Sequence, residues 1–287
     1  MPTTDDTSET TADETPVVAP ARRRRIKLMD VVGPTLLFCV FLGFWYWLSY
    51  YGMSEHRRFL VPPLHKVLDD GFLNWTNLSI MLKALWLTTQ VALWGLGIAI
   101  LWGMSLAIMM SQARWIEGSV WPYAVALQSF PILALVPLIG VVFDYNFNAR
   151  VIVCIIISIF PIINNTLFGI QSVESGHHDL LTLHHASRLT RLRKLQLPAA
   201  SPAIFAGFRI SAGLSVVGAI VGDFFFRKGD KGIGILIDQY ASRTTTLPRL
   251  YAATILAGAL GYLVFSAFGL ITRRLIGKWY ESADLSG

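Results

Sequence analysis

Charged residues are scarce in this chain of 287 residues. Lys, Arg, Asp and Glu together make up 15% of it, whereas a soluble domain averages about 25%. Apolar residues make up 54%, and the mean hydropathy is +0.53. The long apolar stretches are separated by short polar loops, which leave no room for a separate soluble domain. The composition therefore indicates a membrane protein embedded in a lipid bilayer.

Cysteine is also scarce. Cys39 and Cys154 are the two in the sequence, and both lie in apolar stretches without the spacing of a disulfide framework or a metal site. We expect both to be small, buried hydrophobic residues.

A nucleotide-binding motif is lacking. The P-loop pattern G-x-x-x-x-G-K-[ST] occurs nowhere, and the pair Gly277-Lys278 has Thr272 where the first glycine belongs. We expect no cofactor on this chain, so any energy from ATP must enter through another polypeptide. The net charge of +6 does not imply a nucleic acid partner, because basic loops in a polytopic chain usually record its orientation in the membrane.

The N-terminus lacks the layout of a signal peptide. Its first 20 residues contain five acids and no base, and such a segment does not order itself. A basic collar follows, from Arg22 to Arg25 with Lys27, directly before the first apolar stretch. This pattern predicts a disordered cytoplasmic tail over residues 1–27 and a retained transmembrane anchor over residues 28–60.

Six apolar stretches are long enough to cross a bilayer as helices, since a crossing needs about 20 residues. They predict an all-α, multi-pass protein of the plasma (cytoplasmic) membrane with both termini in the cytoplasm. Thirteen cations fall on the predicted cytoplasmic side and ten on the other; the cations nearest the first span weigh most, although the loop over 227–249 fits poorly. The predicted spans are 31–51, 81–110, 119–143, 149–170, 201–226 and 249–276.

Polar and helix-breaking residues interrupt the third, fourth and fifth spans. Prolines free backbone carbonyls, and amides at membrane depth usually face the interior of a bundle. Contact between helices explains any one of them as well as pathway lining does, but together they indicate broken helices around a cavity, as in a transporter. Asp223 can equally be a carboxylate at the edge of a loop. The candidate pathway residues are Gln128, Pro131, Asn164, Asn165 and Asp223.

The segment DLLTLHHASRLTRLRKLQLP, residues 179–198, is basic and lies between two apolar spans. It has no Pro or Gly before Pro198, so it predicts one helix that this proline ends. Its cations would hold the helix at the anionic inner leaflet. On a helix, one arc of about 120° contains Leu181, Leu189, Leu192 and Leu195, with His185 beside them.

This segment resembles the cytoplasmic EAA loop in permease subunits of binding-protein-dependent ABC importers. In that family Glu-Ala-Ala and a glycine precede Ile-x-Leu-Pro at fixed spacing; here the last motif is Leu195-Gln196-Leu197-Pro198. The stretches LQSFPILALVPLI and FPIINNTLFGI are similar to the branch for nitrate, sulfonates, taurine and bicarbonate. Two departures stand out: Asp179-Leu180-Leu181 replaces Glu-Ala-Ala, and His185 replaces the glycine that favours a tight turn.

The resemblance implies a type I ABC importer permease domain over residues 61–280, with a coupling loop at about 174–198. It implies a homodimer, an ATPase subunit that carries ATP and Mg and receives the loop, and an extracytoplasmic substrate-binding protein. Leucines in place of alanines imply a differently shaped, dedicated ATPase groove. The implied substrate is a small organic or oxyanionic nutrient, nitrate-, sulfonate- or taurine-like or a vitamin precursor. The implied coupling residues are Asp179, Leu180, Leu181, His185, Ala186, Ser187, Arg188, Leu195, Leu197 and Pro198.

Two other functions stay open. A secondary transporter without ATP would share the spans, but most of the intramembrane polar groups are amides, which disfavours proton coupling. A membrane metalloenzyme would pair His177 with His184 and His178 with His185, which return to one helix face. Such enzymes need several His clusters, so we expect neither a metal nor a catalytic residue, and a transport subunit rather than an enzyme.

Overall fold

The computed structural model describes residues 28–276, and the predicted tail over 1–27 lies outside them. In this range all regular structure is helical and no strand is present, which confirms the predicted all-α class. The chain divides into two compact units, Met1–Trp47 and Leu48–Gly287.

Most of α1 (Leu28–Tyr50) belongs to the first unit. Its apolar part, Val32–Tyr50, is long enough to cross a membrane. Cys39 is exposed on this helix, so the expected burial was wrong for this cysteine. An apolar residue of a membrane helix can be covered by lipid tails instead of by protein, because lipid is as apolar as a protein core.

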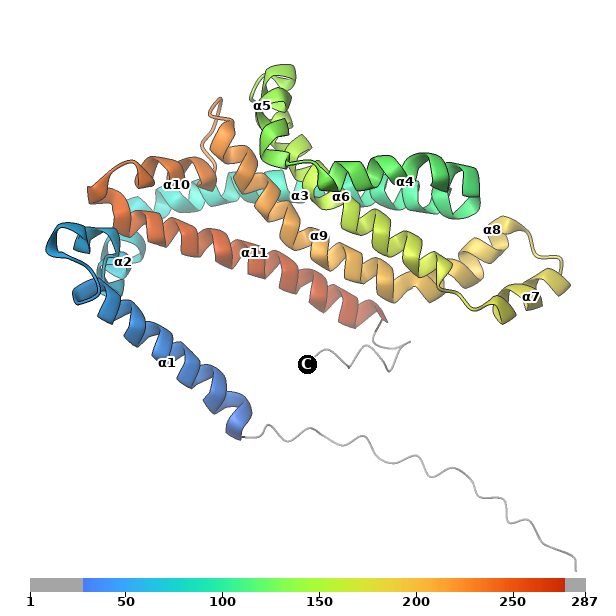
Figure 1. Ribbon diagram of the computed structural model, residues 1–287, viewed down its shortest axis with the longest axis horizontal. Helices are drawn as coiled ribbons and strands as arrows, with labels where there is room; N and C mark the ends of the chain where they lie inside the picture. Colours follow the sequence, from blue (N-terminus) through green and yellow to red (C-terminus); the bar gives the residue numbers. More distant parts are fainter. Residues whose placement is uncertain (1–27, 277–287) are drawn as a thin grey trace, which may run out of the picture. The chain divides into compact units, whose positions relative to one another are not determined.

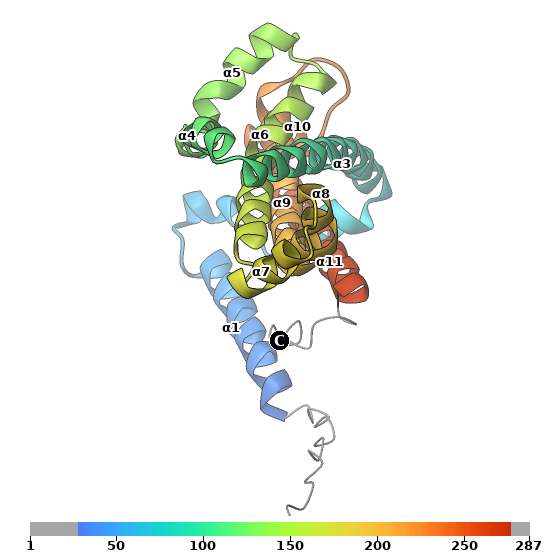
Figure 2. The same cartoon turned by 90° about the vertical axis from the view of Figure 1, so that its right-hand side faces the viewer.

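Four long helices form the bundle of the second unit (Figures 1 and 2). α9 packs against each of the other three, and small residues let their backbones approach closely. A Cβ added to Gly218 of α9 would lie 2.8 Å from the Cα of Cys154. Cys154 is buried at this contact, as predicted. The four helices are α3 (Trp75–Gln112), α6 (Phe147–Gln171), α9 (Leu197–Phe225) and α11 (Leu247–Ile276).

The third predicted span is a bent pair, α4 (Arg114–Ser129) and α5 (Ile132–Phe143), with 101° between the two helices. Phe130 and Pro131 join them in extended conformations. The break follows from the proline, which disfavours a helical conformation in the preceding residue and has no N–H of its own. Five helices are individually long and apolar enough to span a membrane, or six if this pair counts as one span.

Short helices lie at the two ends of the bundle (Figure 1). α10 (Ile233–Ala241) is at one end, and α7 (Ser175–Leu183) with α8 (Arg188–Arg191) is at the other. These ends are called the α10 end and the α7 end below. The α10 end also contains η1 (Glu55–Leu60), α2 (Leu64–Val67), η2 (Leu68–Leu73) and η4 (Thr244–Thr246), and η3 (Leu192–Gln196) leads from α8 into α9.

Candidate functional site

Residues 179–198 do not form the single helix predicted from the sequence. A four-residue turn separates α7 from α8. Within it His185 has a φ of +49°, which no helix can continue through. Ser187 then starts the next helix, because its Oγ accepts a hydrogen bond from the N–H of Thr190 at 3.2 Å. The turn and the serine cap outweigh the helix propensity of the neighbouring leucines.

The backbone makes a tight turn at His185, the position at which the EAA loop that this segment resembles has a glycine. Its N–H donates to the carbonyl of Thr182 at 3.0 Å, and the N–H of Ala186 donates to the carbonyl of Leu181 at 3.0 Å. Helices commonly end in this way, with one residue in the left-handed conformation. The left-handed conformation is unfavourable by roughly 1–2 kcal/mol for a residue with a Cβ. The turn at His185 is therefore locally strained, and the rest of the loop must stabilise it.

Pro198 does not end a helix, contrary to the prediction. It lies in the first turn of α9, and the chain is helical from α8 through η3 into α9. Since proline has no N–H, the carbonyl of Lys194 loses its usual donor. The wider, π-type turn before Pro198 accommodates this loss, with the N–H of Leu197 donating to the carbonyl of Leu192.

Apolar and basic side chains share the surface of this loop. Leu180 and Leu183 of α7 are 58% and 76% exposed, whereas Leu192 is buried. The predicted arc of leucines is therefore not a single face, because its members lie in separate helical segments. Of the predicted coupling residues, Asp179, Leu180, His185, Ser187, Arg188 and Pro198 are exposed, and Leu181, Ala186, Leu195 and Leu197 are half-buried.

The histidines of this loop do not share the helix face that a metalloenzyme would need. His177 lies in α7, whereas His184 and His185 lie in the turn beyond it. His177 approaches Glu174, with 3.8 Å between its Nδ1 and the Oε2 of that carboxylate. Between residues 28 and 276, no three His, Cys, Asp or Glu side chains are grouped so that they could hold a metal ion.

Asp223 belongs to a buried polar cluster at the α10 end. Its side chain is fully buried, and its Oδ1 lies 3.3 Å from the Nη1 of Arg150. Its Oδ2 accepts hydrogen bonds from the Oγ1 of Thr88 at 2.6 Å and from the N–H of Gly234 at 3.4 Å. One carboxylate thus joins α3, α6, α9 and α10. The cluster is separate from the cavity that Gln128 lines, so the candidate pathway residues do not come together.

Arg150 fastens the chain after α9 to the same cluster. It is 1% exposed, and its Nη2 donates to the carbonyls of Phe226 at 2.7 Å and Lys228 at 3.3 Å. Gly232 makes room for the carboxylate, since a Cβ there would overlap Asp223. From the sequence alone, Arg150 counts as one of the ten cations on the predicted outer side. The sequence did contain a signal for the pairing of Arg150 with Asp223. Neighbouring antiparallel spans place the start of one beside the end of the next, and Arg150 is at the start of the fourth span while Asp223 is near the end of the fifth.

Gln128 lines a cavity of about 210 Å³ at the break between α4 and α5. Pro131 is the N-cap residue of α5 and shapes this break. One turn beyond Pro161 of α6, the Nδ2 of Asn165 donates to the Pro161 carbonyl at 2.8 Å, and Asn164 is exposed. The other lining residues are Leu127, Phe130, Ile132, Ile156, Ile157, Phe160, Pro161 and Leu214.

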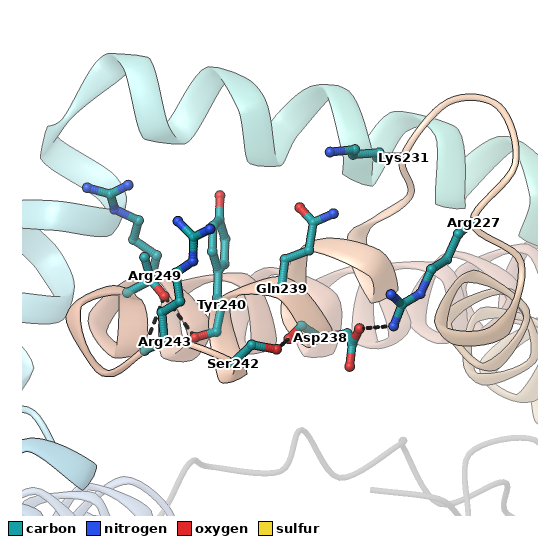
Figure 3. A pocket seen from close by; sticks show the side chains of 9 residues that line it. Arg227, Lys231, Asp238, Gln239, Tyr240, Ser242, Arg243 and Arg249 are labelled. Atoms are coloured by element: carbon teal, nitrogen blue, oxygen red, sulfur yellow. Dashed lines mark hydrogen bonds and ion pairs between the residues drawn. The ribbon is translucent and has the colours of Figure 1, made fainter.

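A second cavity, of about 630 Å³, lies at the α10 end (Figure 3). Four cations line it, and two of them are paired. The Nη2 of Arg227 lies 2.5 Å from the Oδ2 of Asp238, toward which it points in Figure 3. The Nε of Arg249 lies 3.1 Å from the Oδ2 of Asp70. We call this cavity the basic pocket.

The other two cations of the basic pocket, Lys231 and Arg243, have no ion-pair partner in the part of the chain that the structure describes. Tyr240 lines the same pocket, and burial raises the pKa of its phenol. The phenol therefore stays neutral, and the pocket carries an excess of positive charge at neutral pH.

Residues 99–280 match the family model described as "Binding-protein-dependent transport system inner membrane component". The chain belongs to this family. It is the membrane-embedded permease of an importer for small nutrients, and the sequence-based expectation of such a permease is confirmed. The bent third span, the turn between α7 and α8, and the surfaces at the α7 end and the α10 end are thus features of a transport subunit.

Known relatives agree with this assignment. The chain is 30% identical to the riboflavin transport system permease protein of Chloroflexus aurantiacus, over 83% of this chain and 87% of that protein. It is 30% identical to a bicarbonate transport system permease protein of Synechococcus elongatus, over 76% and 75%. The crystal structure of an amino acid ABC transporter with histidines shares the fold, with a TM-score of 0.55 and 18% identity over 72% of this chain and 98% of that one.

Proposed function

We propose that residues 175–198 form the coupling loop, the surface on which a separate ATPase subunit acts. The observation that carries this is the exposed apolar tip of α7. Leu180 and Leu183 are 58% and 76% exposed at the end of the bundle, and the same loop contains exposed cations such as Arg188. Exposed leucines in a charged segment are typical of a surface that another protein covers. ATP and Mg are then held by the ATPase, and this chain binds no cofactor.

In this proposal the coupling loop transmits force from the ATPase subunit to the membrane helices. α8, η3 and α9 are continuous, so a push on α8 is delivered along a rigid helix into the membrane. α9 contacts α3, α6, α10 and α11. Movement of the coupling loop therefore tilts the bundle as a unit. Alternating access to the transport pathway follows from this rigid-body rotation.

The α7 end faces the cytoplasm in this proposal, together with both termini. The basic collar Arg22 to Arg25 supports this orientation through the positive-inside rule. The α10 end then faces outward, where the unpaired Lys231 and Arg243 of the basic pocket are placed to contact acidic residues of a substrate-binding protein. Charge complementarity of this kind mainly speeds the encounter of two proteins.

Two copies of the chain enclose the transport pathway in this proposal. Gln128 is an exposed amide on a membrane segment, and facing it to lipid is unfavourable. The amide of Gln128 avoids contact with lipid if a second copy of the chain, or a water-filled path, lies beside the cavity that it lines. The substrate is a small nutrient, as it is for the riboflavin and bicarbonate relatives. Riboflavin and bicarbonate differ in charge, so these relatives do not indicate whether the substrate is neutral or anionic.

Co-purification in mild detergent tests the proposed partnership. We expect an ATPase subunit to be recovered in near-equal amount with this chain, and to be lost in Leu183→Asp. Leu73→Asp is the matched control, since Leu73 is 76% exposed, as Leu183 is, but lies in η2 at the α10 end and outside the membrane spans. A chain that is folded but never recovered with an ATPase would overturn the proposal, as would equal recovery in all three proteins.

A further inference from the structure

The cavity at the α4–α5 break is nearly uncharged. No Lys, Arg, Asp or Glu belongs to its lining, and Gln128 is its one polar side chain among the described residues. The basic pocket, in contrast, is lined by Arg227, Lys231, Arg243 and Arg249. The two cavities thus differ in charge, because cations line the basic pocket and none lines the cavity at the broken span.

Two hydrogen-bonding groups are available at this cavity. The side-chain amide of Gln128 makes no hydrogen bond with any residue the structure describes. The carbonyl of Ile157 loses its helical donor, because the residue four positions later is Pro161. Both Ile157 and Pro161 line the cavity with Gln128. Gln128 therefore offers a donor and an acceptor to a molecule that enters the cavity, and Ile157, whose carbonyl lacks its helical donor, belongs to the same wall.

The rest of the wall is aromatic and aliphatic. Phe130, at the helix break, is 53% exposed, and Phe160 of α6 belongs to the same lining. Aromatic side chains pack favourably on flat rings, face to face or edge to face. Leu127, Ile156 and Leu214 complete an apolar surface that such a ring can cover.

We propose that this cavity receives a neutral heteroaromatic nutrient, a flat ring whose edge carries hydrogen-bond donors and acceptors. An oxyanion would be desolvated here without a cation to stabilise it, which is strongly unfavourable. A neutral ring loses little on entering, stacks on the phenylalanines and pairs its edge with Gln128. This inference rests on the proposed function and makes Gln128 a specificity-determining residue.

Equilibrium binding to the permease–ATPase complex in nanodiscs tests the inference. The ring probes are riboflavin, adenine, nicotinamide and 4-amino-5-hydroxymethyl-2-methylpyrimidine, and the anion probes are nitrate, bicarbonate, sulfate and methanesulfonate. We expect at least one ring probe, and no anion probe, to bind in a way that depends on Gln128. Gln128→Leu should weaken the ring probe about tenfold, the effect of losing one to two hydrogen bonds. Gln128→Met serves if the leucine variant is not recovered.

Gln90→Leu is the matched control, because Gln90 lies in α3 outside this cavity, and it should leave binding unchanged. Phe130→Leu should weaken ring binding by removing the aromatic contact. Anion binding that Gln128→Leu weakens, binding of no ring probe, or unchanged ring affinity in the Gln128 variants would each overturn the inference. A complex that co-purifies with its ATPase but binds nitrate in a Gln128-dependent way would refute this substrate class and leave the proposed function intact.

Discussion

Arg150 and Asp223 form an ion pair between two spans, with 3.3 Å between Nη1 and Oδ1, and neither side chain is more than 2% exposed. The arginine also holds the chain that leads from α9 to α10. Because the pair joins helices that are far apart in the sequence, it fixes the α10 end as one body.

Removing one partner of this pair should be far more damaging than removing both. Asp223→Asn leaves the Arg150 guanidinium buried without a counter-charge, which costs about 3–5 kcal/mol of stability. The double variant Arg150→Met with Asp223→Leu should recover much of that loss. Thermal unfolding in detergent measures the effect.

Asp238→Asn is the control for this prediction. It removes the partner of Arg227, whose side chain is 68% exposed, and an exposed pair contributes about 0–1 kcal/mol. Equal destabilisation by Asp223→Asn and Asp238→Asn would contradict the structural role given to the buried pair.

His185 and His184 should respond in opposite ways to glycine. His185 has a φ of +49°, whereas the φ of His184 is −85°. Both substitutions add the same freedom to the unfolded chain, so their difference isolates the strain at His185. We expect His185→Gly to be more stable than His184→Gly by about 1–2 kcal/mol. Hydrogen exchange of the loop amides measures this, and a ranking in favour of His184→Gly would refute the strained turn.

Reversing the unpaired cations of the basic pocket should weaken the response to a substrate-binding protein. Lys231→Glu and Arg243→Glu replace attraction with repulsion, so we expect several-fold more binding protein to be needed for half-maximal ATP hydrolysis. The difference should shrink at high salt, because exposed charges are screened. Arg274→Glu, an exposed cation at the other end of α11, is the control. No change in the pocket variants would place the docking surface elsewhere.

The sequence predicts the spans well because hydropathy over about 20 residues is a strong local signal. The break between α4 and α5 is also local, since Pro131 acts on its immediate neighbours. The coupling loop shows the limit of this reasoning. The absence of Pro and Gly indicated one helix, but the backbone turns at His185 in a conformation that residues other than glycine rarely adopt.

The buried pair could not be predicted from periodicity. The one other charged residue in the predicted span of Asp223 is Arg209, whereas its partner Arg150 comes from a different span. Burial of both residues depends on how α6 and α9 pack, and neither helix specifies that packing alone. The break of the span that contains Gln128 was predicted and is observed, whereas the uncharged wall around Gln128 is formed by three segments that only the fold brings together.

The most direct test of the coupling loop places a photo-cross-linking amino acid at Leu183, in the permease assembled with its ATPase subunit. A second protein carries it at Tyr262, which is 71% exposed on α11. We predict that the ATPase subunit is captured from position 183 and not from position 262, and that capture changes when ATP is added. Capture from position 262 alone, or from neither position in a complex that hydrolyses ATP, would contradict the assignment of residues 175–198 as the coupling loop.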